Sequence, residues 1–220
     1  MRISRSIPVC LMSGLVLLGG CARDYAVSPS GFLTPETYAS LEQGDVQDQL
    51  VTWSNDDVDA ANYRGFLVDP VELRIEDDAD ASDISTEQMT ELSEYFHRTV
   101  VDFLGRDHQI ADEAGPEVLR VRIAVTDVKK AVVALNIHPA TSIAGFGLGA
   151  AAMEAEVTDS VSGETVFAMI GGRKGSPFGF EKFDPWGHAK QAMDLWAEHL
   201  AENLVVTAPE GIKPDRERNV

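Results

Sequence analysis

Apolar residues lie on one face of each regular segment of this chain, and this one-sided patterning limits the fold more than any other feature. Two segments have helical spacing. The first follows a capping box of Ser85 and Gln88 and stops near Gly105, and its apolar face holds Met89, Leu92, Phe96, Val100 and Phe103. The second has Asp184 as N-cap and Pro185 as first helical residue, and its apolar stripe is Trp186, Ala189, Met193, Trp196, Leu200 and Leu204.

Three other segments alternate as strands do. In the run from Val118 to Thr126, apolar and basic residues point to opposite sides. One side has Leu119, Val121, Ile123 and Val125, and the other has Arg120 and Arg122. A hairpin is predicted where Met153, Ala155 and Val157 alternate with Glu154, Glu156 and Thr158, before the turn Ser160–Gly163 and the strand Glu164–Ile170. Phe66 and Val68 also alternate, and Val71, Leu73 and Ile75 resume one residue out of step after Pro70, which indicates an edge strand or a bulge.

Helices with one apolar face and alternating strands must cover each other. We therefore predict an α/β fold of the α+β type, a two-layer sandwich in which two helices lie on one face of a mixed, mostly antiparallel sheet. A single domain is expected over residues 31–208, followed by a mobile charged tail at 209–220. The acidic stretch Leu41–Val58 is interpreted as a loop or irregular cover anchored by Trp53.

The first 20 residues have the pattern of a signal peptide. Arg2 and Arg5 precede the apolar stretch Ile7–Leu18, which is too short to span a bilayer. The stretch ends in Leu18-Gly19-Gly20-Cys21, which resembles a bacterial lipobox. We predict cleavage between Gly20 and Cys21 and lipidation of the Cys21 thiol. The alternative is an ordinary secretory signal with an incidental cysteine.

Lipidation would anchor the mature chain to a membrane by acyl chains such as palmitate, with residues 21–30 as a lipidated tether. The tether would dock on the domain through Ser30-Gly31-Phe32-Leu33. Ala22, rather than Asp, follows the cysteine, and this resembles Gram-negative lipoproteins of the outer membrane more than those of the inner membrane. Cys10 would leave with the signal, so the mature chain would have no free thiol for catalysis, zinc binding or disulfides.

The chain has 36 acidic and 18 basic residues, a net charge of −18, and this excess argues against nucleic-acid binding. Removal of Arg2 and Arg5 with the signal lowers the basic count from 18 to 16 and the net charge to −20. We interpret the excess as a solubilising coat near a membrane or an adaptation to a salty medium.

Four sequence features are candidate sites. The run Gly145–Gly149 resembles part of a dinucleotide-binding loop, but it leads into a strand, which favours close packing or a mobile loop. The stretch from Val132 to Gly149 is either a partner-contacting or membrane-contacting loop or a loop folded over the core. An acidic loop precedes the first helix, and the spacing of its aspartates favours solvated charges over a Ca²⁺ site. These residues are Asp77, Asp78, Asp80 and Asp83. The five histidines are not spaced along the sequence as metal ligands usually are. They are His97, His108, His138, His188 and His199.

The ordered motifs of the mature chain resemble those of an uncharacterised Gram-negative lipoprotein family, the domain of unknown function 3313. The matching marks are Ser30–Leu33, Tyr63, Val68–Leu73, Leu119–Arg122, Thr126-Asp127, Ser142-Ile143, Met153–Glu156, Asp159 and Ser162–Glu164. The resemblance implies the envelope location and the fold, and it implies no activity and no catalytic residue.

These observations predict a lipid-anchored, non-enzymatic binding or structural module in the periplasm, at the outer membrane. We expect no cofactor, no metal and no nucleic-acid partner, and an envelope protein as partner. The working surface would be the sheet face away from the helices, or the Val132–Gly149 loop. The alternatives are an auxiliary lipoprotein subunit of an envelope transport system and a hydrolase of cell wall or lipid, which would need a polar cleft.

Overall fold

The computed structural model describes residues 29–47, 50–59, 62–75, 84–129, 150–174 and 184–204. Several predictions fall outside these ranges: the signal peptide, cleavage and lipidation at Gly20 and Cys21, the insert Asp77–Asp83, the loop Val132–Gly149 and the tail. Within these ranges, no helix is both long and apolar enough to cross a membrane.

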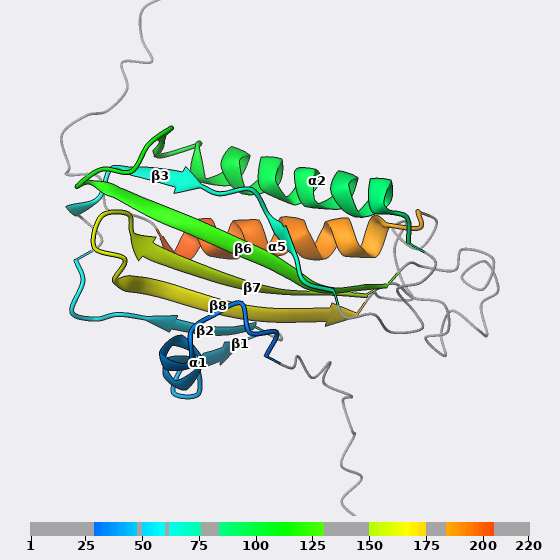
Figure 1. Cartoon of the computed structure of the whole chain (residues 1–220), viewed down its shortest axis with the longest axis horizontal. Helices are drawn as coiled ribbons and strands as arrows, with labels where there is room; N and C mark the ends of the chain where they lie inside the picture. Colours follow the sequence, from blue (N-terminus) through cyan, green and yellow to red (C-terminus); the bar gives the residue numbers. More distant parts are fainter. Residues whose placement is uncertain are drawn as a thin grey trace, which may run out of the picture.

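A mixed sheet of eight strands forms the centre of the molecule, and the predicted fold class is confirmed (Figure 1). Its order is β1-β2-β8-β7-β6-β3-β5, with β4 paired to β6. The strands are β1 (Asp45–Gln47), β2 (Leu50–Ser54), β3 (Gly65–Val68), β4 (Glu72–Leu73), β5 (Gln109–Ile110), β6 (Val118–Lys129), β7 (Ala150–Asp159) and β8 (Thr165–Lys174). The pairs of β3 with β5 and β6, and of β4 with β6, are parallel, and the other four are antiparallel.

Two long helices, α2 (Thr86–Leu104) and α5 (Gly187–Asn203), pack on the sheet and on each other. The capping box at α2 is confirmed: the Ser85 hydroxyl accepts from the Gln88 amide, and the Gln88 side chain accepts from the Ser85 amide. Gly105 is the C-cap, as predicted. The predicted start of α5 is two residues too early, because Asp184 Oδ1 accepts from the Trp186 amide at 2.9 Å in a separate turn before the helix.

The main core lies between these helices and the sheet. It contains predicted inward residues of β6 and β7, among them Leu119, Val121 and Met153, which are 0% exposed, and it also contains Phe167 of β8, which is 1% exposed. Phe96 of α2 and Trp196 of α5 meet in this layer with ring centroids 6.1 Å apart. The one-sided pattern of strands and helices therefore produces the core that it predicts.

The interruption at Pro70 divides one strand into two. β3 pairs with β6 from Gly65 opposite Val118, whereas β4 pairs with the same strand from Glu72 opposite Ala124. Seven residues on one side therefore oppose six on the other. The one-residue phase shift predicted from the sequence is confirmed as an irregularity of this kind.

The interpretation of Leu41–Val58 as irregular cover is wrong. This stretch holds β1 and β2, and β2 extends the sheet by pairing with β8 over Leu50–Ser54. A short helix that was not predicted, α1 (Pro35–Leu41), precedes them, with Thr34 as its N-cap. In Figure 1, α1 lies beside β1 and β2, apart from α2 and α5. The pattern is hard to recognise because β2 contributes to both faces: Leu50 packs with the main core, and Val51 and Trp53 pack with a second cluster.

Candidate functional site

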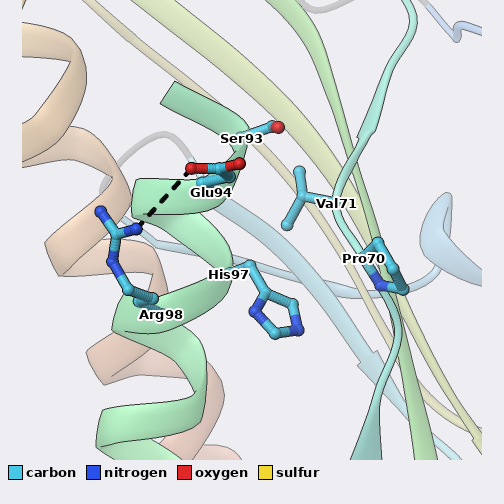
Figure 2. A pocket seen from close by; sticks show the side chains of 6 residues that line it. All are labelled: Pro70, Val71, Ser93, Glu94, His97 and Arg98. Atoms are coloured by element: carbon cyan, nitrogen blue, oxygen red, sulfur yellow. Dashed lines mark ion pairs between the residues drawn. The ribbon is translucent and has the colours of Figure 1, made fainter. Parts of the chain in front are cut away.

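A cavity of about 240 Å³ lies between α2 and the interruption at Pro70 (Figure 2). Pro70 and Val71 form the strand side, and four residues of α2 form the other: Ser93, Glu94, His97 and Arg98. The ring of His97 reaches toward the strand, and its Nε2 lies 3.4 Å from the carbonyl oxygen of Val68. The cavity therefore combines an apolar wall with an imidazole and a guanidinium.

This cavity is a weak candidate for a small-molecule site. Its volume is below the range of about 300–1,000 Å³ that is usual for such sites. Arg98 pairs with Glu94 at 3.9 Å, and the two side chains are 63% and 64% exposed, so the pair attracts an anion only weakly.

The sheet face away from α2 and α5 holds the more informative arrangement. It is covered by the N-terminal segment Ser30–Leu41, which includes α1 and which we call the strap. Strap residues Phe32, Leu33 and Leu41 are buried and pack against Ala124 and Ala168 of the sheet in a separate cluster. The predicted docking of Ser30-Gly31-Phe32-Leu33 on the domain is confirmed. Where the strap lies, that sheet face is therefore not the open working surface that the sequence suggests.

Beneath the strap, β7 buries the carboxylate of Glu154, which is 0% exposed. The described residues give it three hydrogen bonds, and all come from the strap. The Ser30 amide donates to Oε1 at 2.8 Å, the Ser30 hydroxyl donates to Oε2 at 2.9 Å, and the Tyr38 hydroxyl donates to Oε2 at 2.7 Å. Burial and the Glu154 hydrogen bond raise the pKa of Tyr38, so this hydroxyl keeps its proton at neutral pH.

Glu156 follows Glu154 by two residues on β7. It is 3% exposed and joins the strap to the sheet. Its Oε1 accepts from the hydroxyl of Thr37 at 3.0 Å and from that of Thr165 at 3.1 Å. Its Oε2 accepts from the guanidinium of Arg122 at 3.4 Å. The carboxylate thus has one donor from the strap, one from β8 and one from β6.

Two guanidiniums flank the ring of Phe32 at the entrance of the strap. Arg122 lies 4.8 Å and Arg74 5.3 Å from the ring centroid, which is within cation–π range. Arg74 also donates to the carbonyl oxygen of Gly31 at 3.2 Å, and Gly31 has φ +75°, a conformation that glycine adopts without strain. The strap is therefore held near its start by both charge and apolar contact.

The two glutamates are suited to holding a peptide segment. A buried carboxylate is costly unless donors surround it, and here donors from the chain itself surround both. In this arrangement the oxygens meet the strap and its neighbours rather than solvent. The two glutamates therefore hold the strap on the sheet in this structure.

The histidines lie in separate places. Among the described residues, no group of three His, Cys, Asp or Glu side chains could hold a metal ion. His97 lines the cavity, His188 is buried on α5, and His199 lies 4.0 Å from Glu202. His108 packs edge-on against Phe66 at 5.1 Å, and burial lowers its pKa. His138 lies outside the described residues.

In the sequence, Glu154 and Glu156 fall on the polar side of an alternating strand, so their burial as a pair is not predicted. A usable signal is present, since they lie on a strand that is otherwise rich in alanine and apolar residues. Burial itself depends on the strap, whose short helix has no strong periodic pattern.

Residues that carry the family resemblance also contact one another in the structure. Ser30 contacts Glu154, Phe32 contacts Arg122, and the same guanidinium contacts Glu156. At the far end of the sheet, the Tyr63 hydroxyl donates to Asp159 at 2.9 Å. Near the Pro70 interruption, Asp69 pairs with Arg120 at 2.8 Å. The motifs scattered along the sequence thus form contact pairs in space.

Comparison with solved structures finds distant similarity over about two thirds of the chain. A PelC dodecamer from Paraburkholderia phytofirmans is 14% identical, with a TM-score of 0.42, over 68% of this chain and 96% of that one. A protein from Xanthomonas campestris is 12% identical, with a TM-score of 0.40, over 66% and 85%. A putative neuraminyllactose-binding hemagglutinin homolog from Helicobacter pylori is 11% identical, with a TM-score of 0.35, over 68% and 87%.

No curated protein matches the chain. The family model described as "Protein of unknown function (DUF3313)" matches residues 28–200, which include the strap, the sheet and most of α5. The resemblance drawn from the sequence motifs is thereby confirmed, and the chain belongs to the DUF3313 family of proteins of unknown function.

Proposed function

We propose that this protein is a lipid-anchored lipoprotein of the cell envelope, lipidated on Cys21 after cleavage at Gly20, whose domain is a non-enzymatic binding or structural module. The observation that carries the proposal is the position of the lipobox-like Leu18–Cys21, nine residues before Ser30 docks on the sheet. A membrane anchor at Cys21 would therefore lead almost directly into the fold. The proposed location is the periplasmic face of the outer membrane.

The buried strap supports this proposal in physical terms. A domain tethered by its N-terminus needs a segment that joins the tether to the fold. Here the attachment combines Phe32 and Leu33 in an apolar cluster with hydrogen bonds from Ser30 to Glu154. Its position at the start of the fold fits a chain that is held from that end.

The first test compares the masses and membrane binding of two cysteine variants. The chain without substitutions should yield a mature protein that begins at Cys21, has the added mass of acyl chains and pellets with outer membranes. Cys21→Ser should abolish acylation and release a folded domain once its signal is removed. Cys10→Ser is the matched control, because Cys10 precedes the cleavage site and should change neither result. An unacylated mature chain, or continued pelleting of Cys21→Ser after signal removal, would contradict the proposal.

The second test is crosslinking in intact cells followed by identification of the partner. An outer-membrane or periplasmic protein would support the envelope binding module. An inner-membrane transport complex would instead support the auxiliary-subunit alternative. This measurement separates the two roles, which share the same anchor.

A further inference from the structure

The strap packs apart from the main core. Its apolar residues pack in their own cluster with Ala124 and Ala168, and the core under α2 and α5 contains no strap residue among those described. Lifting the strap would therefore expose a small second cluster and leave the main core covered. Local opening of this kind is expected where few buried apolar contacts hold a segment.

The buried glutamates weaken the docked state relative to an apolar seam. Docking removes the carboxylates of Glu154 and Glu156 from water, which is costly, and strap donors offset that cost. On release, water would hydrate both carboxylates again. The two carboxylates therefore make the docked strap less stable relative to the released strap than apolar side chains at the same positions would.

Outside its docked place the strap has little structure of its own to keep. Helix α1 has seven residues, and isolated helices shorter than about 12–15 residues are marginal in water. The hydroxyls of Thr37 and Tyr38 that face the sheet come from this helix. Docking and helix formation should therefore occur together.

We propose that Ser30–Leu41 is a releasable strap whose docking on Glu154 and Glu156 sets the length of the link between Cys21 and the domain. With the strap docked, residues 21–30 span at most about 30 Å. With it released, the link runs to β1 at Asp45 and spans at most about 80 Å. The strap equilibrium is a property of the domain, and the change of reach rests on the proposed anchor at Cys21.

Hydrogen exchange of the full mature chain in a urea series tests the strap equilibrium. Amides of residues 30–41 should exchange at least about tenfold faster than those of residues 92–104 in α2, with a weaker dependence on urea. Equal rates and equal urea dependence in the two segments would overturn the proposal, because the strap would then open only by global unfolding.

A matched pair of tyrosine variants tests the role of the buried carboxylate. Tyr38 and Tyr95 each donate to a carboxylate at 2.7 Å, one to Glu154 under the strap and the other to Asp194 of α5. Tyr38→Phe should speed exchange in residues 30–41 at least about tenfold and leave residues 92–104 unchanged. Tyr95→Phe should leave residues 30–41 unchanged. An identical response of the strap to both variants would contradict the assignment.

The change of reach is tested with the lipidated chain on phosphatidylethanolamine–phosphatidylglycerol vesicles that contain a headgroup quencher. A dye on Val161→Cys reports distance, because Val161 is 68% exposed at the hairpin turn. Tyr38→Phe should reduce quenching relative to the unsubstituted chain, whereas Tyr95→Phe should not. Equal quenching of Tyr38→Phe and the unsubstituted chain would contradict the proposed change in the length of the link. If instead the mature chain isolated from cells carries no lipid and does not bind the vesicles, the anchor is refuted and the exchange result still stands.

Discussion

The two faces of one sheet are covered in different ways. On one face, α2 and α5 bury an apolar layer in which Phe96 is 1% exposed and meets Trp196. On the other, the strap covers a smaller cluster around two buried glutamates. The same strand β7 supplies both faces, with Met153 and Ala155 on one side and Glu154 and Glu156 on the other.

The difference shows that burial alone does not define a core. The helix-covered face gains stability from the burial of apolar area, and this stability tolerates exchanges between apolar side chains of similar volume. The strap-covered face depends on satisfied hydrogen bonds, so the loss of one donor matters more than the loss of a methyl group. The first face should therefore set global stability, and the second should set local opening.

The largest expected effect comes from the same substitution on the two faces. Phe96→Ala should lower the free energy of unfolding by about 3–5 kcal/mol, because it leaves a cavity in the main core. Phe32→Ala should lower it by less than about 1 kcal/mol, because its cluster is small and lies apart from the main core. Urea denaturation followed by tryptophan fluorescence measures both. Equal losses would mean that the two faces form one cooperative core.

At alkaline pH, two tyrosines on the helix-covered side should destabilise the fold. Burial, followed by a hydrogen bond to a carboxylate, raises the pKa of Tyr63 and of Tyr95 from 10 to about 12. The unfolded chain loses these protons first, so stability should fall as pH rises from about 10 to about 12. Denaturation at several pH values should show this slope. Tyr95→Phe should reduce the slope, and an unchanged slope would exclude its contribution.

A smaller effect is expected in acid from Asp159, which closes the β7–β8 hairpin. Backbone hydrogen bonds, chiefly from the Ser162 amide, and the Tyr63 hydroxyl lower the pKa of this carboxyl below its ordinary value of 3.8. Its contribution is present above pH 3.8 and is lost as pH falls through the lowered value. Asp159→Asn should flatten the acid limb of the stability curve. Asp57→Asn, in an exposed turn, is the control.

The smallest effect is expected at the cavity beside α2. Arg98→Ala should change the free energy of unfolding by less than about 0.5 kcal/mol, because its pair with Glu94 is exposed and 3.9 Å apart. Thermal denaturation measures the change. A loss above about 1 kcal/mol would mean that this pair belongs to the packed part of the helix-covered face.

The fold could be predicted where a local pattern in the sequence identifies an element or its end. The capping box at Ser85, the hairpin over β7 and β8 and the phase shift at Pro70 are local patterns, and the structure confirms each. The predicted start of α5 is misplaced because Asp184 caps a turn two residues earlier than the helix. Both a turn and a helix accept an Asp in that position.

The strap site could not be predicted in the same way. Its contacts join residues more than 100 positions apart, such as Ser30 with Glu154 and Tyr38 with the same carboxylate. A glutamate in an alternating strand normally faces water, and the alanine-rich surroundings of Glu154 and Glu156 in the sequence do not show which distant segment covers them. Helix α1 escapes prediction because seven residues carry too little periodicity.

By itself, the sequence determined the layer of helices, the alternation of the strands and the motifs of the DUF3313 family, since each depends on neighbours in the chain. It also contains the lipobox-like pattern on which the proposed anchor rests. Only the tertiary structure decided that the second face is covered and that Glu154 and Glu156 are buried there. The reason is physical: burial of a polar side chain depends on which distant segment supplies its donors.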